Sequence, residues 1–463
     1  MQFIENKTFA ELAIGDTATL VRTLGQDDIE LFAVMSGDVN PAHVVPGFAR
    51  TDAFHKVIAH GMWGGALISA VLGTELPGPG TIYLNQTLNF LLPVGLGDTV
   101  TVRVTVTAKD AARQHVTLHC QCSNQNGEDV IDGEALVIAP TLKVRRPRVA
   151  MPEVHLHERG KHYHALIDAT THLDPILTAV VHPCDQPSLS GAIEAQSQGM
   201  IIPILVGPQA KIAAAAQAAG IDLTHVEIVD VPHSDAAAAK AVELVRGAKA
   251  AAIMKGKLHT DELMRPVLDA DTGLRTKRRM SHIFAFDVPT YPKPLFITDA
   301  AINIYPDLAQ KGDITQNAID LARALGIKVP KVAILSAVET IYPRIASTVD
   351  AAALCKMADR GQITGGLLDG PLAFDNAISA TAARTKGIVS QVAGDADILV
   401  APDLEAGNMI AKQLIYMAGA DAAGIVLGAR VPIILTSRAD GQMARLASCA
   451  LAQLFLHRHT PRV

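Results

Sequence analysis

"TVTVRVTVTA", residues 99–108, places valine at every even position from 100 to 106. This two-residue period is typical of an antiparallel strand with one buried face. "QHVTLHCQCSN" (114–124) and "GEALVIAP" (133–140) continue the pattern on either side of a turn. The preceding "HGMWGGALISAVLG" (60–73) is apolar nearly all round, which predicts a buried helix. Its small residues would let a sheet wrap closely around it, so we expect an α+β domain built on a central helix.

The second part of the chain follows a different pattern. Short apolar runs such as "IIPILVG" (201–207) and "KVAILSA" (331–337) indicate strands buried on both faces. They alternate with alanine-rich helical stretches such as 234–250 and 313–327. This order predicts parallel sheets in an α/β domain with two lobes.

Residues 141–164 are basic, contain proline and lack periodicity, which predicts a linker between domains at 1–140 and 165–463. The histidines of this stretch are compatible with a metal site or with a solvated tether. Because no carboxylate or cysteine pattern accompanies them, we favour the tether.

Composition excludes several classes of function. A net charge of −6 argues against a nucleic-acid-binding surface. No apolar run reaches the ~18 residues that a bilayer span requires, and the first twenty residues lack a signal-like core, so we expect no membrane association. The five cysteines are an odd number spread over the chain, which favours free thiols and a cytoplasmic location. Cys120 and Cys122 would share one face of a strand, where we expect them to pack in the core.

A polar break, "SGDVNPAH" (36–43), interrupts the apolar pattern with an acid and an imidazole. Turn residues alone explain a helix stop, but they do not explain Asp38 and His43 together. With "FHKVIAHGMWGGALIS" (54–69) and "LNQTLNFLLPVGLGDTVTV" (84–102), this stretch resembles the MaoC-like (R)-specific enoyl-CoA hydratases, which have the hot-dog fold. The resemblance implies that Asp38 and His43 form a catalytic dyad.

The residue types suit that chemistry. Adding water to an α,β-unsaturated thioester needs a base, an acid and a donor for the developing enolate-like oxygen. The resemblance implies that the backbone N–H of Gly61 binds the thioester oxygen, and Gly61 would open the buried helix at the positive end of its dipole. Asn40 either orients the dyad or forms an Asx-turn before Pro41; we slightly favour the turn.

The C-terminal part resembles the phosphate acetyl/butyryltransferases over residues 165–463. The resemblance rests on several stretches in the family's order, among them "IEAQSQGMIIPILVGP" (193–208), "MKGKLHTDELMRPVL" (254–268), "FITDAAINIYPDL" (296–308) and "PIILTSRADGQMARLASCALA" (432–452). It implies transfer of an acyl group between CoA and inorganic phosphate, with no metal and no organic cofactor. A metal- and NAD-dependent decarboxylating dehydrogenase is the rival, but the chain lacks the carboxylate cluster and the glycine motif it would need.

Arginine is suited to this reaction because its planar fork binds phosphate oxygens in pairs. Ser437 and Arg438 follow a buried apolar run, where loops of α/β proteins carry ligands. The resemblance implies that this pair lies at the reacting centre, with Ser437 donating a hydrogen bond to the transition state. Arg265 and Arg279 match further basic positions and are candidates for phosphate binding.

The acidic and amide residues of the matched stretches each have more than one possible role. Acetyl-specific members carry an acid several positions after the Ser–Arg pair, where this chain has Ala444. Asp440 lies closer and resembles the butyryl-type version, so its role as base for the CoA thiol and the acyl length both stay open. Asp299, Asp369 and Asn408 either line the cleft or cap helices.

We therefore expect a bifunctional enzyme whose substrates are a short 2-enoyl-CoA, a short acyl-CoA, inorganic phosphate and acyl phosphate. Exposed apolar sheet edges usually pair, so a homo-oligomer is expected. The alternative is a phosphate acyltransferase whose hot-dog half only binds acyl-CoA or holds subunits together.

Overall fold

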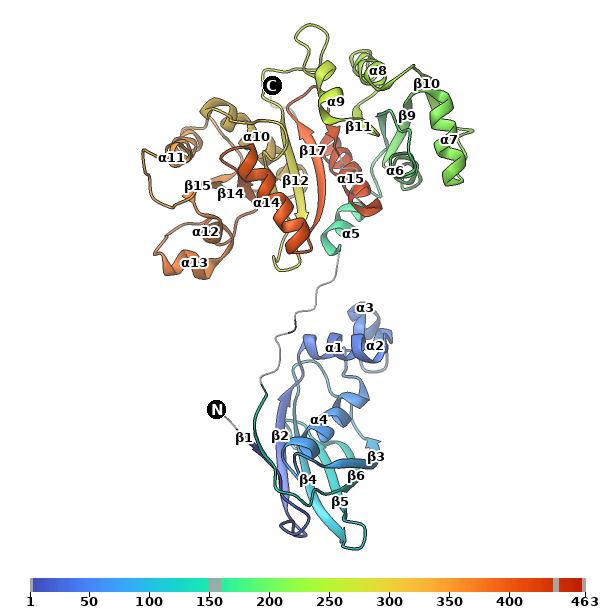
Figure 1. Ribbon diagram of the computed structural model, residues 1–463, viewed down its shortest axis with the longest axis vertical. Coiled ribbons are helices and arrows are strands. Elements are labelled where there is room, and N and C mark those ends of the chain that lie inside the picture. The colour runs from blue at the N-terminus through green and yellow to red at the C-terminus, as the bar shows by residue number, and fades with distance from the viewer. Residues whose placement is uncertain (1–2, 150–153, 155–159, 436–440, 460–463) are drawn as a thin grey trace. The chain divides into compact units, whose positions relative to one another are not determined.

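The computed structural model describes residues 3–149, 154, 160–435 and 441–459. The chain folds as two units, residues 1–156 and 157–463 (Figure 1).

An antiparallel sheet forms most of the N-terminal unit, with its strands in the order β2-β4-β5-β6-β3. The sheet strands are β2 (Thr17–Thr23), β3 (Ile82–Phe90), β4 (Thr99–Asp110), β5 (His115–Ser123) and β6 (Asp129–Ile138). The helices are α1 (Gln26–Ser36), α2 (Pro41–Val44), α3 (Pro46–Ala49) and α4 (Gly61–Thr74). Figure 1 shows α4 lying along the sheet, with the short helices grouped near one end. The predicted α+β hot-dog architecture is confirmed.

Small residues let α4 approach the sheet closely. A Cβ added to Gly64 would overlap Ile131 Cδ1, and one added to Gly65 would lie 3.1 Å from Leu88 Cδ1. Cys120 and Cys122 are fully buried in the same core, which confirms that they pack there. Burial raises the pKa of the Cys120 thiol to about 11. All five cysteines are free thiols.

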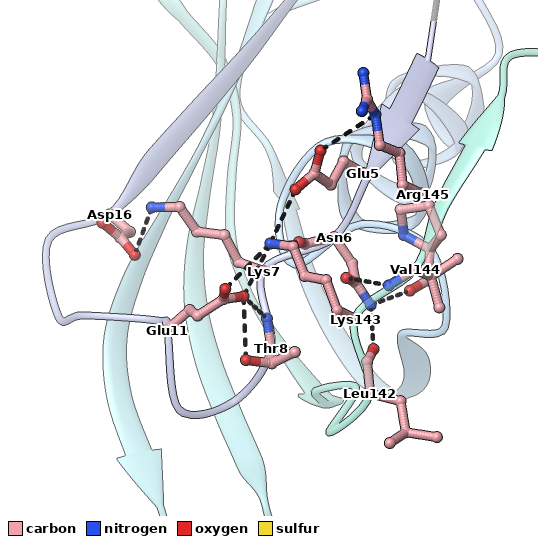
Figure 2. Close-up of polar contacts among 11 residues, drawn as sticks. Glu5, Asn6, Lys7, Thr8, Glu11, Asp16, Leu142, Lys143, Val144 and Arg145 are labelled. Atoms are coloured by element: carbon pink, nitrogen blue, oxygen red, sulfur yellow. Dashed lines mark hydrogen bonds and ion pairs between the residues drawn. The ribbon is translucent and has the colours of Figure 1, made fainter.

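The folded N-terminal unit extends beyond the predicted boundary at residue 140. Strand β7 (Arg145–Pro147) lies inside the predicted linker region and pairs antiparallel with β1 (Phe3–Glu5) at the N-terminal side of the unit. Figure 2 shows how polar contacts hold these segments together: Lys143 Nζ lies 3.2 Å from Glu5 and 3.0 Å from Glu11, and the buried Asn6 amide bonds the backbone of residues 142 and 144. Strands this short, held by charges, leave no hydrophobic period in the sequence.

A single mixed sheet forms the C-terminal unit, in the order β10-β9-β8-β11-β18-β17-β12-β13-β16-β14-β15. Its strands are β8 (Ile176–Val181), β9 (Ile201–Gly207), β10 (Glu227–Asp230), β11 (Ala252–Lys255), β12 (Ser281–Asp287), β13 (Leu295–Thr298), β14 (Lys331–Leu335), β15 (Leu367–Leu372), β16 (Ile398–Val400), β17 (Asp421–Leu427) and β18 (Ile433–Ile434). Its helices are α5 (Lys161–Asp168), α6 (Gln186–Ser197), α7 (Gln209–Ala219), α8 (Ser234–Arg246), α9 (Thr260–Val267), α10 (Leu308–Ala324), α11 (Ala346–Asp359), α12 (Phe374–Ile378), α13 (Ala380–Thr385), α14 (Leu404–Met417) and α15 (Gln442–Arg458).

Two parallel groups of strands make the two lobes that were predicted. One group runs from β10 to β18 and the other from β13 to β15. Between them, β17 is antiparallel to β18 and to β12, and β12 is antiparallel to β13. The expectation of parallel sheets therefore holds within each group of strands and is wrong at the centre. An apolar run reports burial on both faces but does not encode strand direction.

Helices cover both faces of this central region. In β12, Ile283 and Ala285 belong to the buried cluster that includes α15, whereas Phe284 and Phe286 pack in the cluster that includes α14. Figure 1 shows both helices beside the central strands. Among the described helices, none combines the length and apolarity that crossing a bilayer requires.

Candidate functional sites

The polar break in the N-terminal unit is a turn between α1 and α2. Helix α1 ends at Gly37, whose φ of 75° lies in the left-handed region that glycine adopts without a Cβ penalty. Asp38 Oδ1 accepts a hydrogen bond from the N–H of Asn40 at 3.2 Å. Asn40 Oδ1 in turn accepts from the N–H of Ala42 at 3.2 Å and caps α2. Asn40 therefore makes the local capping turn that the sequence favoured, and its predicted part in substrate binding stays untested.

His43 is buried, and its hydrogen bond fixes the tautomer of its ring. His43 Nδ1 lies 2.9 Å from the carbonyl oxygen of Ile58. A carbonyl can only accept, so Nδ1 carries the proton and, in the neutral ring, Nε2 keeps its lone pair. This is the state that a general base requires.

His60 is a neighbour of the dyad that the sequence analysis did not select. Its Nε2 donates to the backbone oxygen of Asp38 at 3.0 Å, and its ring centroid lies 4.1 Å from that of His43. One potential ligand atom from each of Asp38, His43 and His60 lies within 4.8 Å of the others. In the sequence, the one feature that could have pointed to His60 is its position directly before Gly61 in "IAHG".

A cavity of about 280 Å³ lies beside these histidines. Its wall includes His43, His60 and Gly61, and the rest is mainly apolar, with Trp63 and Phe90 among the lining side chains. Gly61 is the first residue of α4, so its N–H has no acceptor within the helix. The side chain of His60, at the N-cap, makes no capping bond within the described structure. The first backbone N–H of α4, an imidazole with a lone pair and a mainly apolar cavity therefore lie at one place.

In the C-terminal unit, Ser437, Arg438 and Asp440 lie outside the described residues, so their assigned roles stay predictions. The described chain reaches Leu435 directly before them. Gly424 lies beside both Leu435 and His282. A Cβ added to Gly424 would be 2.5 Å from the backbone oxygen of Leu435 and 2.8 Å from His282 Nε2. Burial lowers the pKa of His282 to about 4.

Asp299 directly follows β13 and, with 3% of its surface exposed, is the most buried of the predicted acidic residues that the structure describes. Asp299 Oδ1 accepts hydrogen bonds from the N–H groups of Ala301 and Ile302 at 2.9 and 3.1 Å. Burial raises the pKa of its carboxyl, and hydrogen bonds from the backbone and from Asn303 oppose that rise. One of the backbone hydrogen bonds that lower the pKa of the Asp299 carboxyl comes from His282, which also lies beside Gly424 and Leu435.

Asn303, which the sequence analysis did not select, joins two of the predicted residues. Its Nδ2 donates to Asp299 Oδ2 at 2.5 Å, and its Oδ1 accepts from Arg279 Nε at 2.6 Å. Asn408 Nδ2 donates to the oxygen of Ala300, next to Asp299, at 3.0 Å. The structure therefore brings Arg279, Asp299 and Asn408 together. Arg279 is otherwise exposed, and its terminal nitrogens have no ion-pair or hydrogen-bond partner among the described residues.

Arg265 and Asp369 are not linked to this group by any contact of the described residues. Arg265, on α9, forms an exposed ion pair with Asp235 at 3.6 Å, the arrangement of an ordinary surface cation. Asp369 lies in the edge strand β15, which β16 and β14 separate from β13, and its Oδ1 accepts from the N–H of Gly370 at 2.8 Å.

A larger cavity of about 1080 Å³ lies between α10 and the C-terminal end of α15. Arg278, Asp320, Arg323 and Arg458 are among its lining residues, and Arg278 pairs with Asp320 at 2.5 Å. Of the predicted site residues that the structure describes, none lines this cavity.

Comparison with known proteins gives two separate family matches. The model of the phosphate acetyl/butaryl transferase family matches residues 232–452, and the model of the MaoC like domain matches residues 11–124. An R-hydratase from Pseudomonas aeruginosa in its unliganded form is 42% identical, covering 34% of this chain and 99% of its own, with a TM-score of 0.33.

Two further proteins resemble the C-terminal part. A branched-chain phosphotransacylase from Enterococcus faecalis is 28% identical, covering 61% of this chain and 100% of its own, with a TM-score of 0.54. A phosphate acetyltransferase from Rhizobium meliloti is 63% identical over 296 residues, which are 64% of this chain and 94% of the relative. With this identity over nearly the whole relative, the chain belongs to the phosphate acetyl/butaryl transferase family and carries a MaoC-like hot-dog domain at its N-terminal side.

Proposed function

We propose that the C-terminal unit transfers an acetyl group between CoA and inorganic phosphate. Family membership supports the reaction class, and the observation that carries the site is the Asp299–Asn303–Arg279 chain of hydrogen bonds. The hydrogen bond from Arg279 Nε to Asn303 Oδ1 orients the guanidinium before phosphate binds. This orientation lowers the entropic cost of binding phosphate.

In this proposal, the CoA thiolate attacks the carbonyl carbon of acetyl phosphate. The C–S bond forms, the C–O bond to phosphate breaks, and phosphate leaves with the electron pair. Ser437 and Arg438 stabilise the tetrahedral oxyanion between these events, and Asp440 is the candidate that accepts the thiol proton. Neither a metal nor an organic cofactor takes part.

Arsenolysis of acetyl-CoA tests this assignment. Arg438→Gln should reduce turnover by at least ~100-fold, the loss that follows removal of one oxyanion-stabilising donor. The matched control is Arg430→Gln, which removes the same charge from an exposed loop residue that belongs to the larger cavity. Equal turnover in Arg438→Gln and wild type would remove Arg438 from the site. A panel of acyl-CoAs from acetyl to hexanoyl would settle the acyl length.

We also propose that the N-terminal unit hydrates a short 2-enoyl-CoA to the (R)-3-hydroxyacyl-CoA. The observation that carries this proposal is the His43 Nδ1–H bond to Ile58, which leaves Nε2 free to accept a proton from water. One water would be held between Nε2 and the Asp38 carboxylate. Its oxygen adds to C3 and its proton is passed to C2 on the same face, while the N–H of Gly61 binds the thioester oxygen.

The alternative is a hot-dog unit that binds acyl-CoA, or joins subunits, without catalysis. Crotonyl-CoA separates the two, because only a hydratase removes the absorbance of the enoyl thioester. Asp38→Asn and His43→Gln should each lower hydration by ~100-fold or more. His119→Gln is the matched control, since it breaks a histidine–carboxylate contact elsewhere in this unit, with Asp132 at 2.7 Å on the sheet. No hydration by protein whose transferase is active would favour the non-catalytic module.

A homo-oligomer and a cytoplasmic location remain our expectations. Strand β3 is an edge of the N-terminal sheet, and its Ile82, Leu84 and Phe90 side chains are exposed. Exposed apolar edges of this kind commonly pair with another chain. Light scattering on the purified protein tests this expectation, and a monomeric mass at micromolar concentration would contradict it.

A further inference from the structure

We propose that Asp38, His43 and His60 bind a divalent first-row transition metal ion, of which Zn²⁺ is the probe of choice, and that the bound ion blocks hydration. Binding of the ion depends only on the geometry below. Inhibition rests in addition on the hydratase function proposed above.

The donor set matches the ligand chemistry of such ions. Zn²⁺ takes imidazole nitrogen and carboxylate oxygen at ~2.0–2.2 Å, which places tetrahedral ligands about 3.4 Å apart. The three potential ligand atoms lie within 4.8 Å of one another without an ion. The set must therefore contract by up to about 1.4 Å. Asp38 is exposed on the turn between α1 and α2, so its side chain can rotate toward the two histidines.

Both histidines already have the second hydrogen bond that metal-bound histidines make. A ligating imidazole usually donates its other ring N–H to a carbonyl or carboxylate, which fixes its orientation and raises its basicity. His43 donates from Nδ1 to the oxygen of Ile58, and His60 donates from Nε2 to the oxygen of Asp38. The neutral rings therefore present the lone pairs of His43 Nε2 and His60 Nδ1.

His60 provides a second and independent observation. Only 2% of this residue is exposed, and its Nδ1 is buried without a hydrogen-bond partner among the described residues. Buried polar atoms in native structures are usually satisfied, so an unpartnered one calls for an explanation. His60 is also one of the residues that line the cavity beside His43 and Gly61.

Occupancy of this site and hydration exclude one another. The ion would take the lone pair of His43 and the carboxylate of Asp38, which are the two groups proposed to hold the water. Within the described ranges, this trio is the one group of histidine, cysteine or acidic side chains with metal-ligand spacing. We therefore expect Zn²⁺ to stop hydration, chelator to restore it, and acetyl-CoA arsenolysis to continue throughout.

The test is titration of the chelator-treated full-length protein with Zn²⁺ by calorimetry, and with Co²⁺ by visible absorbance. His60→Gln should lose one site, and Asp38→Asn should bind at least ~10-fold more weakly. His119→Gln should bind like wild type. Because binding is compared between variants, other histidines of the chain contribute equally and cancel.

Two variants, one at a buried and one at an exposed residue, distinguish loss of the metal site from loss of the fold. His60 is buried, so His60→Gln is read together with the exposed Asp38→Asn, which leaves the core unchanged. Equal binding by all four proteins, or no saturable site in wild type, would overturn the inference. Saturable binding lost in both variants supports it, even if the metal-free protein hydrates no crotonyl-CoA; that result would refute the hydratase proposal alone.

Discussion

Replacing Gly61 with proline removes the backbone N–H that is the proposed oxyanion donor, so it tests that donor. Proline is accepted at the first position of a helix, where the missing N–H has no intrahelical role. The residue before a proline must be extended, and His60 already has φ −58° and ψ 134°. The backbone of this site is therefore compatible with the substitution.

The added side-chain atoms need a matched control. A Cβ at residue 61 would lie 3.1 Å from the Phe90 ring, close enough to push that ring outward. Gly61→Ala carries the same Cβ but keeps the N–H. The comparison of Gly61→Pro with Gly61→Ala therefore separates the exchange of the N–H for the proline Cδ from the displacement of Phe90 by a Cβ.

Loss of one preorganised oxyanion donor costs ~10²–10³ in kcat, or about 3–4 kcal/mol of barrier. We expect Gly61→Pro to hydrate crotonyl-CoA 100- to 1000-fold more slowly than Gly61→Ala, by that estimate. Acetyl-CoA arsenolysis should be equal in both variants. Turnover of Gly61→Pro within a few-fold of Gly61→Ala, on folded protein, would refute the role of the N–H.

Three further substitutions test the account elsewhere. Asn303→Ala removes the three hydrogen bonds of a buried amide, so the free energy of unfolding of the C-terminal unit, measured by thermal denaturation, should fall by about 3 kcal/mol, and the KM for phosphate should rise. Substitution of the exposed Gln217 by alanine should change neither quantity. An unaltered KM in Asn303→Ala would contradict a positioning role for Asn303. Gly64→Ala places a Cβ against the buried Ile131 and should lower the free energy of unfolding by ~1–3 kcal/mol. Gly73 has open space around it, so Gly73→Ala should leave the free energy of unfolding unchanged or raise it in the same thermal denaturation experiment. The pKa of His282 is about 4 in the folded protein and 6.5 in the unfolded chain. The contribution of the neutral ring to the free energy of unfolding should therefore be fully present above pH 6.5 and fall by about 3 kcal/mol as the pH drops to 4. Urea unfolding at both pH values should show a smaller drop in His282→Gln than in wild type, and an equal drop would refute this role of His282.

Much of the N-terminal fold was predictable because its signals are local. The valine alternation of 99–108 became β4, and the small apolar stretch 60–73 became α4 with its Gly64 against the sheet. The polar break became a capped turn, for which Gly37 and Asn40 carry familiar chemistry.

The unpredicted features depend on contacts between distant segments. His60 reaches the turn across 22 residues to bond Asp38, and Asn303 reaches back 24 residues to Arg279. Neither residue carries a local pattern that separates it from an ordinary core or capping residue. Arg265 looked equivalent to Arg279 in sequence, yet only Arg279 is held beside Asp299.

The central claim is that one chain carries two independent acyl-CoA active sites. The most direct measurement is crotonyl-CoA hydration and acetyl-CoA arsenolysis on the same preparations of wild type and Asp38→Asn. Our account predicts that wild type performs both reactions, and that Asp38→Asn loses ~100-fold or more of hydration with its arsenolysis unchanged. Arsenolysis without hydration in wild type, or hydration that survives in Asp38→Asn, would contradict it.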